Sequence, residues 1–170
     1  MTPNSRANGV EKQRLLLKKY LGQYYAARIK KRQLEIRLQT FRQDMVGTKG
    51  MQYSPVPRSQ TNKVADGSAS MVVRAIEIED RIESQKAEMN TAMLNVMKIM
   101  DFLPTDSIER SILEYRHIDC LSWKQVCKEV HLSRSSANEH YDKGIKKLLE
   151  FKKVQKVIEE YVATKNPKKP

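Results

Sequence analysis

The chain has 170 residues, with 32 Lys and Arg against 20 Asp and Glu, which gives a formal net charge of +12. Its low aromatic content of 6% and high charged content of 31% favour long solvent-exposed helices over a β-sandwich or barrel. The sequence contains no run of about 18 apolar residues, so we expect no membrane span. It has no apolar segment near the N-terminus that would suggest a signal peptide, and its two cysteines are too few for a disulfide framework. We therefore expect an all-α, cytoplasmic protein whose positive charge attracts a polyanion.

The first predicted element is a basic amphipathic helix within residues 1–46. Residues 1–50 hold 12 Lys and Arg against 3 Asp and Glu, and apolar residues recur at helical spacing on both sides of Gly22, where the helix could break. The run "RIKKRQ" at 28–33 is compatible with a DNA-backbone contact, a protein contact or a solvated face. Lys30 and Lys31 are therefore candidate phosphate contacts.

The next predicted elements are a linker and a second long helix. Residues 47–70 concentrate Gly, Pro and Ser and predict the linker, and residues 71–102 predict the helix. The expected apolar stripe of this helix comprises Val72, Ala75, Ile82, Met89, Met93, Val96 and Met100. Because Glu79 and Lys86 interrupt the stripe, a coiled coil is only weakly indicated. Antiparallel packing on the first helix is simpler, and the hairpin would serve dimerisation or support.

Residues 103–163 predict a helix-turn-helix domain, followed by a disordered tail at 164–170. Pro104 follows a helix stop, and Thr105 or Asp106 is expected to cap the next helix. Ser122 is expected to cap a second helix with the apolar stripe Trp123, Val126, Cys127 and Val130, and Ser133 to cap the last helix. The expected inward stripe of the last helix is Ala137, His140 or Tyr141, Gly144, Ile145 and Leu148.

Subtracting that stripe leaves a polar outer surface on the last helix. Its expected members are Arg134, Ser135, Asn138, Glu139 and Asp142, with Ser136 at the edge. Arg can pair with guanine, Asn with adenine, and Glu can accept from cytosine, so Arg134, Ser135, Ser136, Asn138 and Glu139 are the candidate base-reading residues. The candidate phosphate contacts in this domain are Ser122, Lys124, Ser133 and Lys143. The competing interpretation is an ordinary amphipathic core helix with a solvated face.

Catalysis and metal binding have little support in the sequence. No glycine-rich phosphate loop and no Ser/His/Asp or Cys/His constellation accompanies a motif, so we expect no enzyme and no cofactor. His117, Cys120, Cys127 and His131 have a spacing that matches no usual structural zinc site, so we expect no metal. Trp123, at the start of an apolar stripe, is expected in the core and not as a base-stacking platform.

The segment "SWKQVCKEVHLSRSSANEHYDKGIKKL" resembles region four, the promoter-reading domain of bacterial sigma factors, over roughly residues 104–150. Serines stand where sigma factors often carry charged readers, and no segment resembles the sigma domains that melt promoters. The whole layout, with "MQYSPVPRS" before "VVRAIEIEDRI", resembles the RinA/ArpU-type phage transcriptional regulators.

The resemblance implies an activator of a phage or prophage late operon that serves packaging and morphogenesis. Its expected partners are double-stranded DNA, host RNA polymerase and a second copy of the chain, with no membrane, and its expected location is the bacterial cytoplasm at the nucleoid. Two alternatives stay open: a small terminase subunit, which also joins a helix-turn-helix to oligomerising helices, and a module that docks on polymerase.

Overall fold

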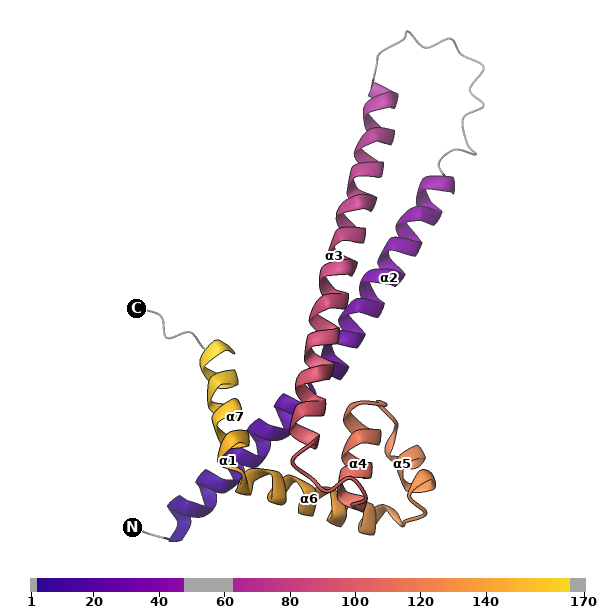
Figure 1. Cartoon of the computed structure of the whole chain (residues 1–170). Helices are drawn as coiled ribbons and strands as arrows, with labels where there is room; N and C mark the ends of the chain where they lie inside the picture. Colours follow the sequence, from indigo (N-terminus) through magenta and orange to yellow (C-terminus); the bar gives the residue numbers. More distant parts are fainter. Residues whose placement is uncertain (1–2, 48–62, 166–170) are drawn as a thin grey trace. The chain divides into compact units, whose positions relative to one another are not determined.

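The computed structural model describes residues 3–47 and 63–165, and these residues form α-helices with no β-strand among them (Figure 1). The all-α prediction is therefore confirmed. The helices are α1 (Pro3–Leu21), α2 (Gln23–Gly47), α3 (Lys63–Met100), α4 (Ile108–His117), α5 (Trp123–Glu129), α6 (Arg134–Glu150) and α7 (Lys152–Lys165).

Two element boundaries differ from the sequence-based expectation. Helix α3 begins at Lys63, so residues 63–70 are helical and not linker. Helix α7 reaches Lys165, so the first two residues of the expected disordered tail are helical as well. The remainder of the expected linker from 48 to 62, and the tail from 166, lie outside the described residues.

The helices belong to two compact units, one formed by residues 27–89 and the other by residues 1–26 together with 90–170. The first unit is a helical hairpin made from most of α2 and from the part of α3 up to Met89. An ion pair joins Arg42 to Glu79, and Lys30 Nζ lies 4.0 Å from Glu88 Oε2. Because the earlier residue of α2 pairs with the later residue of α3, the two helices run antiparallel, as expected.

The hairpin unit packs through a seam that differs from the predicted stripe. Val72 and Ile76 are exposed. On each of the two helices, a set of residues spaced alternately four and three positions apart along the chain is buried or half-buried. On α3 these are Met71, Ala75, Ile78, Ile82, Gln85 and Met89. On α2 they are Ala27, Lys31, Leu34, Leu38, Phe41 and Met45. This alternation is a heptad pattern, so the expected stripe was wrong in register at Val72.

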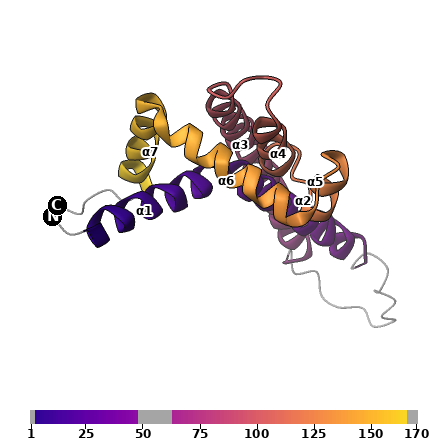
Figure 2. The same ribbon diagram turned by 90° about the horizontal axis from the view of Figure 1, so that it is seen from below.

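The second unit has a core built from both ends of the chain. Leu17, Tyr20 and Leu21 of α1 are buried in one cluster with Ile145 and Leu148 of α6. Helix α1 lies against α6 and α7 (Figure 2), and the rings of Tyr20 and Tyr161 meet edge to face at 5.2 Å between their centroids. We expected the N-terminal Leu and Tyr residues to pack on the middle helix, and Leu17, Tyr20 and Leu21 do share this cluster with Val96, Ile99 and Met100 of α3. The packing of α1 on α6 and α7 is the part that the sequence did not predict.

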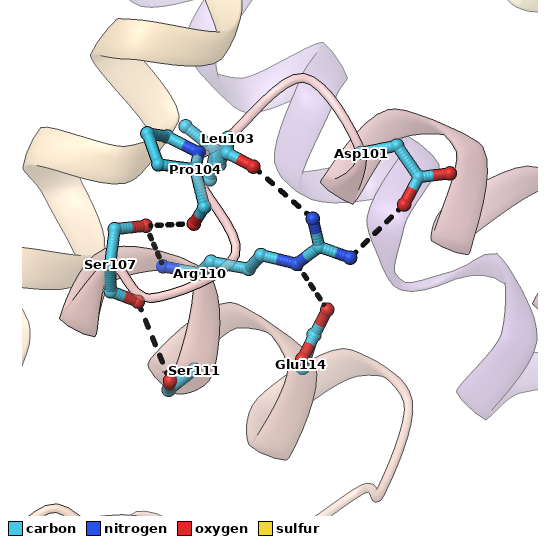
Figure 3. A network of polar contacts seen from close by, with 7 residues as sticks. All are labelled: Asp101, Leu103, Pro104, Ser107, Arg110, Ser111 and Glu114. Atoms are coloured by element: carbon cyan, nitrogen blue, oxygen red, sulfur yellow. Dashed lines mark hydrogen bonds and ion pairs between the residues drawn. The ribbon is translucent and has the colours of Figure 1, made fainter.

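A polar network closes the turn between α3 and α4 (Figure 3). Arg110 donates from Nε to Glu114 at 2.7 Å, from Nη1 to the Leu103 carbonyl at 3.2 Å, and from Nη2 to Asp101 at 3.0 Å. The helix cap is Ser107, whose Oγ accepts from the Arg110 backbone N–H at 3.3 Å.

We expected Thr105 or Asp106 to cap α4, but the N-cap is Ser107. Pro104 is followed by a turn, with the Ser107 N–H bonded to the Pro104 carbonyl at 3.1 Å, before the helix begins. The Ser107 Oγ also donates to the Pro104 carbonyl at 2.8 Å. The turn therefore carries the chain past both expected capping positions.

None of the helices in the described part of the chain has an apolar stretch long enough to cross a membrane.

Candidate nucleic-acid interface

Helices α5 and α6 form a helix-turn-helix joined by residues 130–133. The Leu132 N–H bonds to the Cys127 carbonyl at 3.1 Å and the His131 N–H to the Lys128 carbonyl at 3.3 Å, so the turn is closed by backbone hydrogen bonds. His131 has a φ of 53°, the left-handed conformation that reverses the chain here. A tight turn at "HLS", residues 131–133, therefore joins the two helices, as expected for a helix-turn-helix.

Both helix starts are capped as the sequence predicts. Ser122 and Gln125 form a reciprocal capping box: the Gln125 side chain accepts from the Ser122 N–H at 2.9 Å, and the Ser122 Oγ accepts from the Gln125 N–H at 3.4 Å. At the start of α6 the Ser133 Oγ accepts from the Ser136 N–H at 3.2 Å. These bonds satisfy backbone donors that are otherwise unpaired at a helix start and fix the direction of each N-terminus.

The candidate base-reading residues lie together over the first two turns of α6. Arg134, Ser135, Asn138 and Glu139 are exposed, whereas Ser136 is half-buried and its hydroxyl lies 3.1 Å from the Ser133 Oγ. The opposite side of the helix is anchored in the core by buried residues: Ala137, Tyr141, Gly144, Ile145, Leu148 and Leu149. The inward position left open in the sequence is therefore filled by Tyr141, and the polar surface is held on a rigid element.

His140, the other residue considered for that position, lies at the edge of α6. Its Nδ1 is 3.3 Å from the buried carboxylate of Glu109 on α4, and Lys147 Nζ lies 3.3 Å from the other Glu109 oxygen. Burial by itself raises the pKa of Glu109, but its own backbone N–H, His140 and Lys147 lower that pKa below its ordinary value. The ionised carboxylate therefore helps to hold α4 against α6.

Asp142, which the sequence placed on the outer surface, is half-buried and ion-paired with α1. Its Oδ1 lies 3.0 Å from Lys18 Nζ and 3.1 Å from Arg14 Nη2, both on α1. Burial by itself raises the pKa of Asp142, and the two cations lower it below its ordinary value. Two of the N-terminal cations thus neutralise an acid of α6, a pairing that helical periodicity could not reveal because α1 lies more than a hundred residues away in sequence.

The candidate phosphate contacts fall into two groups. Lys124 on α5 and Lys143 on α6 are exposed in the unit that contains the helix-turn-helix, where Ser122 and Ser133 serve as caps. Lys30 and Lys31 belong to the hairpin unit. The two groups therefore come from different compact units.

The two hairpin lysines also differ from each other in exposure. The side chain of Lys31 is only 24% exposed, occupies a seam position, and pairs with Glu35 at 2.6 Å. The side chain of Lys30 is 64% exposed.

One contact at the start of α6 has no counterpart in the sequence pattern. The Arg134 guanidinium lies over the indole ring of Trp123, 4.4 Å from its centroid, and the Arg116 guanidinium lies 5.6 Å from the same centroid. Trp123 is half-buried and packs against the core, so it joins core and surface. Trp123 and Arg134 are eleven positions apart and lie on different helices. The periodicity of either helix therefore does not predict their contact.

The two cysteines do not belong to any group of potential metal ligands among the described residues. Cys120 and Cys127 are free and half-buried, and Cys127 packs against the core between the helices. No group of three or more His, Cys, Asp or Glu side chains in the described ranges is placed to hold a metal ion. His117 is instead buried beside Tyr141, with its Nε2 3.0 Å from the Tyr141 hydroxyl oxygen.

Comparison with protein-family models, with curated proteins and with solved structures finds no match for this chain.

Proposed function

We propose that the protein is a sequence-specific DNA-binding regulator of transcription that reads the major groove with the start of α6. Arg134, Asn138 and Glu139 supply guanine, adenine and cytosine pairing chemistry, and Ser135 adds a short hydroxyl contact. Ser136 lies at the edge of this surface. The resemblance to RinA/ArpU-type regulators extends the proposal to activation of a phage or prophage late operon, in the bacterial cytoplasm.

The observation that carries the proposal is the exposure of this polar group on a helix-turn-helix. The side chains project from the first two turns of a capped helix, while the other side of that helix is buried. A helix-turn-helix places the N-terminal residues of its second helix against base edges. The varied hydrogen-bonding groups at this end suit base reading better than a uniform cationic surface would.

Positive charge near this surface supports an affinity for duplex DNA. Lys124 and Lys143 are exposed on α5 and α6. Each phosphate contact by a lysine releases condensed counterions, so binding should weaken as salt rises. Lys30 and Lys31 supply either further phosphate attraction or a contact with host RNA polymerase, and a dimer would bind half-sites about 10 base pairs, or a multiple, apart.

The proposal is tested by selecting bound duplexes from a random pool with the full chain, followed by affinity measurements on the selected and a scrambled sequence. We expect Arg134→Ala to weaken binding to the selected sequence by about 1–3 kcal/mol and to relax base preference at one position. Lys143→Ala should weaken both sequences alike and flatten the salt dependence. Recovery of no preferred sequence by the wild-type chain would contradict the proposal.

A reporter fused to the selected site separates regulation from the two alternatives. Activation that requires Arg134 and Asn138 supports a transcription regulator. Ring-shaped oligomers in light scattering, together with binding to a packaging site and no activation, would indicate a small terminase subunit. Full activity of the Arg134→Ala, Asn138→Ala double variant would indicate that the domain docks on polymerase.

A further inference from the structure

We infer that Trp123 is a positioning residue that holds Arg134 in place for base reading; this inference rests on the proposed function. Trp123 is the first residue of α5, directly after the cap Ser122, and Arg134 is the first residue of α6, directly after the cap Ser133. The stack at 4.4 Å therefore joins the N-terminal ends of the two helices of the motif. This distance is well inside the range of about 6 Å over which a cation is attracted to an indole face.

The stack engages Arg134 in a way that leaves its hydrogen-bonding capacity open. A guanidinium donates in its own plane, whereas a cation–π contact uses its flat face. Within the described part of the chain Arg134 has no ion pair, and its side chain is exposed. Its in-plane N–H groups are therefore available to a base, with the side chain already ordered.

Two other arginines of the same unit show the contrast. Arg110 directs Nε, Nη1 and Nη2 to Glu114, the Leu103 carbonyl and Asp101 (Figure 3). Arg116 also lies near the Trp123 ring, but its Nη1 donates to the Leu121 carbonyl at 2.7 Å. These guanidiniums stabilise turns, whereas that of Arg134 remains open toward solvent.

Trp123 can position Arg134 because Trp123 is itself held by the core. Its ring meets Tyr141 edge to face, with centroids 5.3 Å apart and planes at 74°. Tyr141 is buried and its hydroxyl lies 3.0 Å from His117 Nε2. A chain of contacts therefore runs from the buried His117 through Tyr141 and Trp123 to the guanidinium.

The expected benefit is a lower entropic cost of binding. A free arginine side chain loses rotamer freedom when it is fixed on a base, and ordering it beforehand removes part of that cost. A cation–π contact at an exposed site corresponds to roughly a two- to fivefold change in an equilibrium constant. Loss of the indole should therefore reduce the discrimination that Arg134 provides by about that factor.

The test is a double-mutant cycle on the full chain, with Trp123→Leu, Arg134→Ala and the double variant. Affinities are measured on the selected duplex and on a scrambled one. We expect Trp123→Leu to lower the ratio of the two affinities two- to fivefold. The double variant should be no less specific than Arg134→Ala alone, because the indole acts through the guanidinium. Additive losses in the cycle would overturn the inference.

Two controls separate positioning from packing. Phe102→Leu removes a ring that packs on Phe151 at the other end of α6, so it should reduce stability and leave the affinity ratio unchanged. Trp123→Phe retains an aromatic face and should restore most of the specificity lost in Trp123→Leu. If Trp123→Leu does not fold, Trp123→Met replaces it, because methionine fills an apolar site without an aromatic face. An unchanged ratio in both Trp123 variants, while Arg134→Ala lowers it, would refute the inference alone. No preference in the wild-type chain would refute the proposed function.

Discussion

His131 has a left-handed backbone conformation, with a φ of 53°, in the turn between α5 and α6. A side chain with a Cβ pays a steric cost in this conformation, although histidine tolerates it better than branched residues do. Cys120, in the turn before α5, has a φ of 58° and the same cost. Each of the two turns that flank α5 therefore contains one residue with a positive φ and the local steric cost that goes with it.

The first prediction at the residue scale is that His131→Gly stabilises the fold by about 0.5–1 kcal/mol, because glycine adopts a positive φ without the Cβ clash. Chemical denaturation of the purified chain measures the change. Lys128→Gly, on the exposed side of α5, is the matched control and should destabilise by about 1 kcal/mol. A loss of stability in His131→Gly would show that its imidazole makes a contact worth more than the strain.

The second residue-scale prediction concerns His117. Burial, together with the nearby charges of Arg116 and Lys18, lowers the pKa of His117 from 6.5 to about 4. Below pH 6.5 the unfolded chain takes up a proton that the folded chain does not, so stability should fall between pH 6.5 and 4, by about 3 kcal/mol in total.

The measurement is the free energy of unfolding across that pH range. His117→Gln keeps a polar partner for the Tyr141 hydroxyl but cannot titrate, so its curve should be flatter between pH 6.5 and 5. The carboxylates of Glu109 and Asp142 have pKa values lowered from 4.5 and 3.8. The stability that they contribute is therefore lost only as the pH falls through those values, which is below the range used for the comparison. Parallel curves for the two proteins would contradict the assignment.

At the scale of the element, α6 depends on a close approach to α4 at Gly144. A Cβ built on Gly144 would lie 2.8 Å from Leu113 Cδ1 and 3.2 Å from Glu109 Cβ. Leu113 is fully buried, so it has little room to move. Glycine at this position lets the two helices meet, and that contact sets the surface from which Arg134 and its neighbours project.

We predict that Gly144→Val destabilises the chain by about 2 kcal/mol or more, because overpacking forces the core apart and valine brings little gain in helix propensity. Thermal and chemical denaturation measure the loss. Lys143→Val, one residue earlier on the exposed side of α6, is the matched control and should change stability by about 0.5 kcal/mol or less. Equal effects at both positions would mean that the approach of α4 is not tight.

At the scale of the whole molecule, the sequence predicted well those features that depend on residues close together along the chain. Ser122 and Ser133 were identified as caps because a cap and its bonded N–H lie three residues apart. Ser107 was missed because a turn after Pro104 shifts the helix start. The packing of α1 on α6 and α7 was also missed, since a stripe containing Leu17 and Leu21 shows that a face is buried but not every helix that covers it.

The site followed the same division. The exposure of Arg134, Asn138 and Glu139 follows from helical periodicity and was predicted. The pairing of Asp142 with α1 and the stack of Arg134 on Trp123 depend on tertiary packing, which periodicity within one helix cannot reveal.

A prediction at this scale follows from the shared core of residues 1–26 and 90–170. If a specific protease sequence is inserted in the connection between α2 and α3 and then cut, the two fragments should remain associated. Their melting temperature should then depend on concentration, because the association has become intermolecular. Native size-exclusion chromatography followed by denaturing electrophoresis tests this. Leu17→Asp, which places a charge in the core, should weaken the association of the cut fragments, although the seam between α2 and α3 is unchanged. Separation of the wild-type fragments would contradict a shared core.

The pairing of Lys18 with Asp142 also has a consequence for how the protein is made. The two residues are 124 positions apart, so α1 leaves the ribosome long before α6 exists. At about 5–20 residues per second, α1 waits roughly 6–25 s for its partner. Its buried Leu and Tyr side chains are exposed to chaperones during that time. A chain that stops before α6 leaves uncovered the part of this surface that packs on α6 and α7, and exposed apolar surface of this kind makes a truncated chain prone to aggregation.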